Sequence, residues 1–113
     1  MDPPAIRRQL KIKGGVVKRL YKEHGLYKTE TTEQQAKRDK LKEEKSAEEW
    51  DVKNAEKMLE ESKKMVEDSR KRLGNALQEL RSLVKLAQDK PELKRDDELI
   101  NAEQVLKEVE QGD

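Results

Sequence analysis

The sequence predicts an all-α protein, an elongated antiparallel three-helix bundle with coiled-coil-like packing, built from two long helices and one shorter helix. Charged residues make up 45% of the 113 residues and apolar residues only 32%, whereas an ordinary globular domain has about 25% and 45–50%. Apolar residues recur at helical spacing along most of the chain, and no alternating strand pattern is present. We expect a single domain over residues 1–113, with helices at about 5–45, 51–89 and 96–110.

The first predicted helix has one apolar face, on which residues recur at alternating spacings of four and three. This face comprises Ile6, Leu10, Lys13, Val17, Leu20, His24 and Tyr27. Pro3 and Pro4 precede it, and proline suits a helix start because its missing N–H would be unpaired there. Glycines at 14, 15 and 25 each cost about 1 kcal/mol relative to alanine inside a helix. They would be explained by a kink, a frayed start or close helix packing.

The second predicted helix has the most regular spacing, alternating between three and four without a slip. Its stripe comprises Val52, Ala55, Leu59, Ser62, Val66, Ser69, Leu73, Ala76, Leu80, Leu83 and Ala87. Met58 and Met65 flank this stripe and are expected to fill the core. Asp51 is the expected N-cap, and Trp50 before it is expected to pack on the first turn as a hydrophobic staple.

The third predicted helix follows Pro91, since a helix usually ends before the residue that precedes a proline. Its stripe comprises Leu99, Ala102, Leu106 and Val109. Asp96 or Asp97 is the expected N-cap, and Gly112 marks the end. Three apolar stripes joined by short connections bury one another by folding back, which predicts the antiparallel bundle.

Charge is distributed unevenly along the chain, although the formal net charge is only +1. Residues 1–28 carry eight Lys and Arg against two acidic residues, a balance of +6, and residues 92–113 carry three against eight, a balance of −5. Attraction between the first and last helices would explain this asymmetry, and so would binding of an acidic partner.

The composition predicts a protein that is not an enzyme and that has no metal or other cofactor. The chain has no cysteine and one histidine, so thiolate and paired-histidine sites are excluded. His24 lies on the apolar stripe and is expected to be packed and hydrogen-bonded. Neighbouring carboxylates such as Glu60 and Glu61 diverge by about 100° on a helix, and Gly14-Gly15 lacks the spacing of a phosphate loop. No stretch is apolar enough to span a membrane, and the near-neutral balance disfavours nucleic-acid binding.

Two stretches of the sequence resemble the tubulin-binding cofactor A (tubulin-specific chaperone A) family. The first runs from Leu10 to Glu23 and reads LKIKGGVVKRLYKE. The second begins with Trp50-Asp51-Val52-Lys53 and continues through residues 58–66 and 70–73, although Glu67 stands where many members have proline. The resemblance covers roughly residues 6–28 and 48–80, and the final third is similar only in character.

The resemblance implies a chaperone of tubulin folding that captures quasi-native β-tubulin after the chaperonin and hands it on toward assembly with α-tubulin. Binding would be non-catalytic and would use helix surfaces. β-Tubulin is then the expected partner, with other tubulin-folding cofactors as further partners and with neither nucleic acid nor membrane. We expect a cytoplasmic, cytoskeleton-associated monomer or weak homodimer. The alternative is a generic coiled-coil scaffold that oligomerises through its heptad stripes.

Two basic clusters are the expected partner-binding residues, because tubulin is acidic and charge would steer the encounter. They are Lys11, Lys13, Lys18, Arg19 and Lys22 on the first helix, and Lys63, Lys64, Arg70 and Arg72 on the second. The alternative interpretation is that these side chains only solvate the helices or pair with acidic neighbours.

Overall fold

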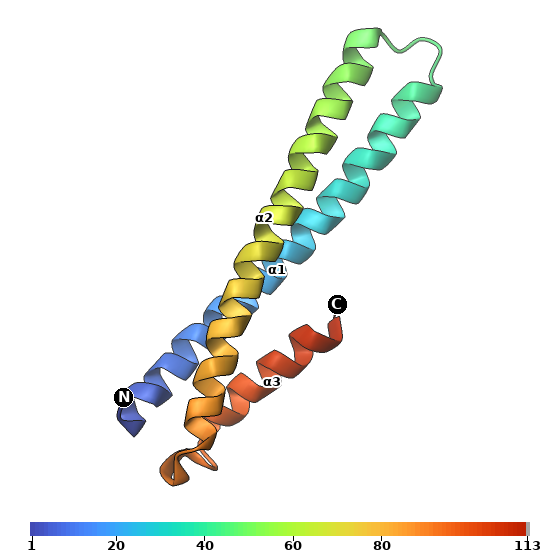
Figure 1. The fold of residues 1–113 in the computed structure, drawn as a ribbon. Helices are drawn as coiled ribbons and strands as arrows, with labels where there is room; N and C mark the ends of the chain where they lie inside the picture. The colour runs from blue at the N-terminus through green and yellow to red at the C-terminus, as the bar shows by residue number, and fades with distance from the viewer. Residues whose placement is uncertain (113) are drawn as a thin grey trace. The chain divides into compact units, whose positions relative to one another are not determined.

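The computed structural model describes residues 1–112. Within them it contains three α-helices and no strand: α1 (Pro3–Glu43), α2 (Glu49–Gln88) and α3 (Asp97–Gly112) (Figure 1). A short 3-10 helix, Pro91–Leu93, lies between α2 and α3. The predicted all-α class, with two long helices and one shorter helix, is confirmed. The observed ends of the helices differ from the expected ones by one or two residues.

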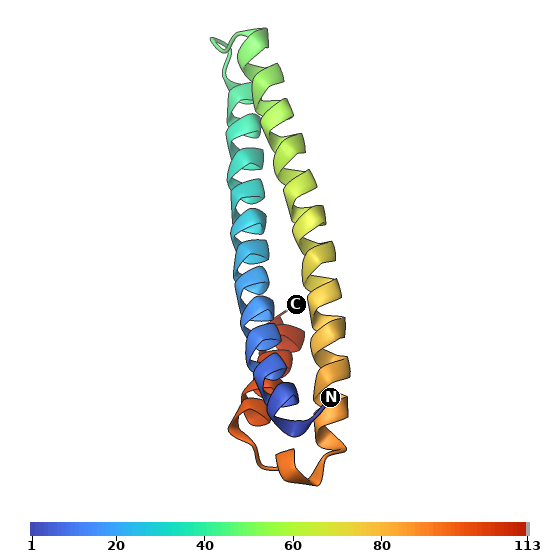
Figure 2. The same cartoon turned by 90° about the vertical axis from the view of Figure 1, so that its left-hand side faces the viewer.

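The chain divides into two compact units, and α1 and α2 each contribute a segment to both. Unit 1 comprises Met1–Tyr21 and Arg72–Asp113, and unit 2 comprises Lys22–Lys71. In unit 1, the start of α1, the end of α2 and the whole of α3 pack together as an antiparallel three-helix bundle (Figure 2). In unit 2, the rest of α1 and the start of α2 form a two-helix hairpin.

The apolar core lies in unit 1, where all three helices contribute. Its most completely buried large side chains are Ile6, Leu10, Val17, Leu80, Leu93 and Leu99. Leu93 comes from the 3-10 helix and has 0% of its surface exposed, so the connection between α2 and α3 is anchored in the same core. Burial of apolar surface at about 25 cal/mol per Å² is the main stabilising contribution in such a core.

Unit 2 buries far fewer large apolar side chains, because a pair of helices covers only one face of each. The buried residues of the hairpin are His24, Ala55, Leu59, Ser62 and Ser69. Most of these side chains are small, which allows α1 and α2 to approach each other along this seam. The seam itself was correctly predicted from the spacing of α2.

Aspartate side chains cap the N-termini of α1 and α3. Asp2 caps α1, since its Oδ1 atom accepts the N–H of Ala5 at 3.0 Å. Asp96 caps α3, since its Oδ1 atom accepts the N–H of Glu98 at 2.9 Å. Of the two caps considered for α3, the structure therefore selects Asp96 rather than Asp97.

The start of α2 differs from the prediction. The helix begins at Glu49, and the carbonyl of Glu48 accepts the N–H groups of Asp51 and Val52 at 3.0 and 3.3 Å. Asp51 is therefore inside the first turn and is not the N-cap. Its carboxylate still lies in the first turn of the helix, where negative charge is favoured by the helix dipole.

Two predictions of apolar packing in unit 2 are wrong. Trp50 is 69% exposed, so it does not form a hydrophobic staple. Met58 is 41% exposed and does not fill the core, whereas Met65 is half-buried. Both errors have one cause: within unit 2 the hairpin has no third helix, and flanking positions of the stripe therefore stay in solvent.

The glycines of α1 do not interrupt the helix, which runs unbroken through positions 14, 15 and 25. None of them has a positive φ, and a Cβ atom at any of them would meet nothing within 4 Å. Neither backbone conformation nor packing therefore requires glycine there. Gly112 differs, because a Cβ atom at that position would collide with the hydroxyl of Tyr21. None of the helices in residues 1–112 combines the length and the apolar content that a membrane span needs.

Candidate partner-binding surface

The nine basic residues expected to bind a partner are distributed over both units. Unit 1 holds Lys11, Lys13, Lys18, Arg19 and Arg72, and unit 2 holds Lys22, Lys63, Lys64 and Arg70. Apart from Lys13, which is half-buried, all of them are exposed. They remain candidates.

Three of the nine residues form ion pairs within the chain. In unit 1, Lys13 Nζ lies 3.0 Å from Glu79 Oε2, so this lysine links α1 to α2. In unit 2, Lys63 Nζ lies 3.7 Å from Glu60 Oε1 on the same helix. Exposed ion pairs of this kind contribute only about 0–1 kcal/mol to stability, but they partly neutralise the charge of each lysine. Lys13 and Lys63 are therefore less available to a partner than their neighbours.

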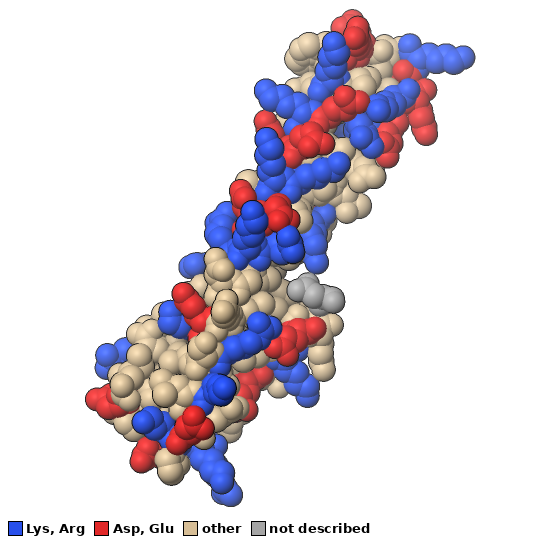
Figure 3. Space-filling model, in the orientation of Figure 1, with Lys and Arg blue, Asp and Glu red and all other residues tan. Residues whose placement is uncertain are grey.

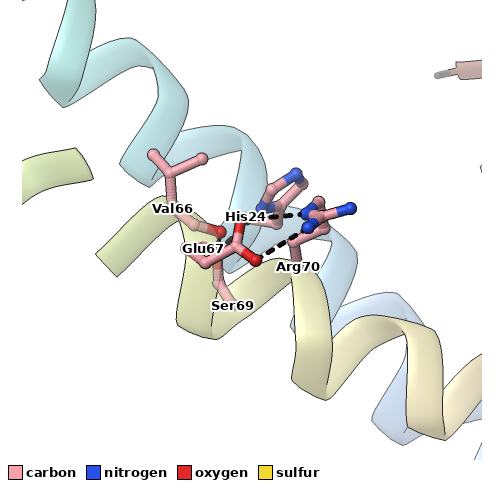
Figure 4. A network of polar contacts seen from close by, with 5 residues as sticks. All are labelled: His24, Val66, Glu67, Ser69 and Arg70. Atoms are coloured by element: carbon pink, nitrogen blue, oxygen red, sulfur yellow. Dashed lines mark hydrogen bonds and ion pairs between the residues drawn. The ribbon is translucent and has the colours of Figure 1, made fainter. Parts of the chain in front are cut away.

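The third pair belongs to a group of polar contacts on unit 2 (Figure 4). Arg70 donates two hydrogen bonds to Glu67, the shorter being 2.7 Å. This hydrogen bond lowers the pKa of Glu67 and raises the pKa of Arg70. Close by, His24 Nδ1 lies 2.7 Å from Ser69 Oγ, and that hydroxyl donates to the carbonyl of Val66 at 2.9 Å. His24 is thus packed and hydrogen-bonded, as predicted.

The other six residues form no ion pair with any residue from 1 to 112. They are Lys11, Lys18, Arg19, Lys22, Lys64 and Arg72. In unit 1, Arg7 pairs with Asp96 at 2.5 Å, while Arg81 on α2 pairs with Glu110 near the end of α3 at 3.1 Å. Attraction between α1 and the acidic last helix therefore involves Arg7, whereas Lys11 and Lys18 further along α1 form no ion pair with residues 1–112.

A groove of about 390 Å³ lies between α1 and α3 in unit 1. Residues of α1 on its wall are Leu10, Lys11, Gly14, Gly15 and Lys18, and residues of α3 are Glu98, Asn101, Ala102, Gln104, Val105 and Glu108. Two of the predicted binding residues, Lys11 and Lys18, therefore line a hollow surface. The feature of the sequence that could have indicated this groove is the pair Gly14-Gly15 inside a predicted helix.

A second, more open depression of about 630 Å³ lies mainly on α2 of unit 1. It is lined by Lys13, Asn75, Gln78, Glu79, Ser82, Leu83 and Leu86. Figure 3 shows that this part of α2 carries a largely uncharged surface on the face drawn, in contrast to the mixed charge elsewhere on that face. The sequence signal was the uncharged run from Leu73 to Gln78 in an otherwise highly charged helix.

The part of the chain that the structure describes, residues 1–112, contains no group of three or more His, Asp or Glu side chains placed to hold a metal ion. What the site offers is exposed helix faces with unpaired cations and two shallow hollows. These cations and hollows make up the candidate surface for a partner.

Comparison with known proteins gives the family. A family model described as Tubulin binding cofactor A matches residues 5–106. Tubulin-specific chaperone A of Homo sapiens is 44% identical over 62 residues, which cover 55% of this chain and 56% of that protein. The protein of the same description from Saccharomyces cerevisiae is 44% identical over 54 residues, covering 48% and 51%. In these matches the chain spans about half the length of each relative.

Two solved structures are similar over nearly the whole chain. The crystal structure of tubulin folding cofactor A from Arabidopsis thaliana has a TM-score of 0.85 at 34% identity, covering 95% of this chain and 97% of that one. Human tubulin chaperone cofactor a has a TM-score of 0.78 at 33% identity, covering 93% and 98%. The chain belongs to the tubulin binding cofactor A family.

Proposed function

We propose that this protein is a tubulin-folding cofactor that captures quasi-native β-tubulin after its release from the chaperonin. It stabilises the bound β-tubulin by non-catalytic contact through its helix faces and then releases it toward the αβ-tubulin heterodimer. The family supports a role with tubulin, since the descriptions of its relatives name tubulin. The role would be carried out in the cytoplasm beside the cytoskeleton, with other tubulin-folding cofactors as further partners.

The observation that carries the proposal is the unpaired positive charge on the exposed part of α1 in unit 1. Lys11, Lys18 and Arg19 are exposed and form no ion pair with residues 1–112. Unneutralised cations raise the local concentration of an acidic protein and accelerate its association. Cations that served only to hold the bundle together would instead be paired with the carboxylates of α3.

The test is a pull-down with β-tubulin released from chaperonin. The wild-type protein should retain β-tubulin, and Lys18→Glu/Arg19→Glu should weaken retention about tenfold at low salt. The matched control is Lys57→Glu/Lys85→Glu, which lowers the net charge equally at two exposed lysines without ion pairs. Both variants should keep wild-type helicity and melting temperature. Retention by the wild type no better than by an unrelated helical bundle would refute the proposal.

The alternative, a scaffold that oligomerises through its heptad stripes, makes a different prediction. In unit 1 the apolar stripe of α2, from Leu73 to Ala87, is buried in the core with α1 and α3 and is not available as a seam between chains. Light scattering should therefore give a discrete small species, a monomer or weak homodimer. Extended oligomers that grow with concentration would favour the scaffold.

A further inference from the structure

Gly14 and Gly15 are unexplained by the fold of the chain itself. Each lies inside α1, where glycine costs about 1 kcal/mol relative to alanine. Neither has a positive φ, and a Cβ atom on either would meet nothing within 4 Å. The backbone conformation and the packing of residues 1–112 would therefore both accept alanine. What the glycines do leave is open space on one face of the helix.

That space is part of the groove between α1 and α3. Gly14, which is buried, and Gly15, which is exposed, both line the groove together with Leu10. Opposite them, α3 contributes the apolar side chains of Ala102 and Val105 to the groove. Without side chains at two successive positions, the main chain of α1 can be approached more closely there than elsewhere along the helix.

Charge on the two walls of the groove is separated. Lys11 and Lys18 stand on the α1 wall, one turn before and one turn after the glycine pair, about 10 Å apart along the helix axis. Both are exposed and form no ion pair with residues 1–112. The α3 wall instead carries carboxylates, those of Glu98 and Glu108.

Between those two carboxylates, the α3 wall presents amide side chains. Asn101 makes no side-chain hydrogen bond to a residue from 1 to 112, and Gln104 donates to Glu108 at 3.3 Å. An amide has both donors and an acceptor, which suit the N–H and C=O groups of a polypeptide main chain. An anionic group placed on this wall would be repelled by the carboxylates, so it would have to lie on the α1 wall.

We propose that this groove seats an acidic polypeptide segment of the tubulin partner. The main chain of the segment lies over Gly14 and Gly15, and two of its carboxylates, about 10 Å apart, pair with Lys11 and Lys18. The inference rests on the proposed function, which it deepens by naming the binding surface and the chemistry of the bound segment. The positive charge of the α1 wall favours an acidic segment, and the missing Cβ atoms allow its main chain to approach α1 closely.

The test uses substitutions that should stabilise the protein while weakening binding. Gly14→Ala and Gly15→Ala should each raise the melting temperature, because they remove a helix-breaking residue without a clash. Each should weaken retention of chaperonin-released β-tubulin at least about fivefold, because the added methyl group fills the space that the main chain of the bound segment would occupy. Gly74→Ala is the matched control, since Gly74 lies inside α2 of the same unit and also has open space around it.

The outcomes separate the two proposals. Stabilisation by all three substitutions, with binding lost only at positions 14 and 15, supports the groove. Wild-type binding by Gly14→Ala and Gly15→Ala overturns the groove but leaves the proposed function standing, whereas failure of the wild type to bind tubulin refutes the function itself. A wild-type dimer that Gly14→Ala converts to a monomer, measured by light scattering, would place a second copy in the groove and overturn the assignment.

Discussion

Replacing Asp96 should reveal how much of the stability of unit 1 depends on one carboxylate. Its Oδ1 atom accepts the N–H of Glu98 at the start of α3, and its Oδ2 atom lies 2.5 Å from Arg7 Nε on α1. The hydrogen bond from Arg7, aided by the backbone N–H groups of Glu98 and Leu99, lowers the pKa of Asp96, while burial opposes this shift. The same side chain thus caps one helix and ties it to another.

The two contributions can be separated by two substitutions. Asp96→Ala removes the cap, which is worth roughly 1 kcal/mol, and the ion pair, worth at most about 1 kcal/mol because Arg7 is nearly half exposed. The loss of about 1–2 kcal/mol corresponds to a fall in melting temperature of roughly 5–10 °C for a domain of this size. Asp96→Asn keeps the cap, since asparagine caps as well as aspartate, and should lose less than about 1 kcal/mol.

Acid should reduce the difference between the wild type and Asp96→Asn. The pKa of Asp96 is lower in the folded chain than the value of about 3.9 expected for an unfolded chain. Its charge therefore stabilises the fold fully above about pH 5, and that contribution is lost as the pH falls through the folded pKa. Urea unfolding followed by circular dichroism at pH 7 and pH 3 measures this change. Equal differences at both pH values, or a loss for Asp96→Asn as large as for Asp96→Ala, would refute the reasoning.

Three further predictions concern the packing, and each is tested by urea unfolding. Ser69→Ala should cost about 1–3 kcal/mol, because it leaves the buried Nδ1–H of His24 without an acceptor. The control is Ser62→Ala, which should be nearly neutral because this buried serine makes no side-chain hydrogen bond to residues 1–112. Equal losses of stability in the two variants would contradict this assignment. Gln34→Leu should stabilise the protein by up to about 1 kcal/mol, because Gln34 Oε1 is buried without a partner among residues 1–112; a destabilised variant would mean that this oxygen is satisfied in solution. Gly74→Ala should add about 1 kcal/mol, and a loss would show that its surroundings are tighter than the structure indicates.

The features predicted correctly from the sequence are those set by local geometry. Spacings of three and four fix which face of a helix turns inward, so the buried seam of α2 and the packed position of His24 followed from the pattern. The cap at Asp96 depends on a short polar side chain just before a helical run, whereas the cap at Asp2 was not predicted. Asp96 could not be distinguished from Asp97 by sequence, because either would satisfy the same rule.

The errors concern how many neighbours cover each helix. Periodicity gives the direction of the apolar face but not the length over which a third helix covers it. The exposed positions of Trp50 and Met58 follow from the two-helix structure of unit 2, which a pattern in α2 alone cannot reveal. The division of the chain into two units likewise depends on where α3 packs in unit 1. The position of α3 is set by contacts between residues far apart in sequence.

The candidate site was predictable only in part, for a related reason. The basic clusters were visible as sequence, but whether a cation is neutralised depends on partners that folding brings close. Lys13 turned out to be paired with Glu79, whereas Lys18 is unpaired. The groove joins Gly14 to residues of α3 about 90 positions away, so the glycine pair could be recognised as a helix anomaly but not as a surface feature.

The charge of α1 and the bare backbone at Gly14 and Gly15 would act at different ranges. Charge attracts a partner over about 8–10 Å at ordinary salt, so it governs the rate of encounter and weakens as salt is added. The space left by two missing Cβ atoms matters only in direct contact, so it governs how long the complex lasts. Carboxylates of α3 that neutralised Lys11 and Lys18 would abolish the first effect without touching the second. The structure instead joins Arg81 of α2 to Glu110 of α3, and the cations beside the glycines stay unpaired within residues 1–112. In the proposed complex, long-range attraction and close approach would thus be combined on the α1 wall of the groove.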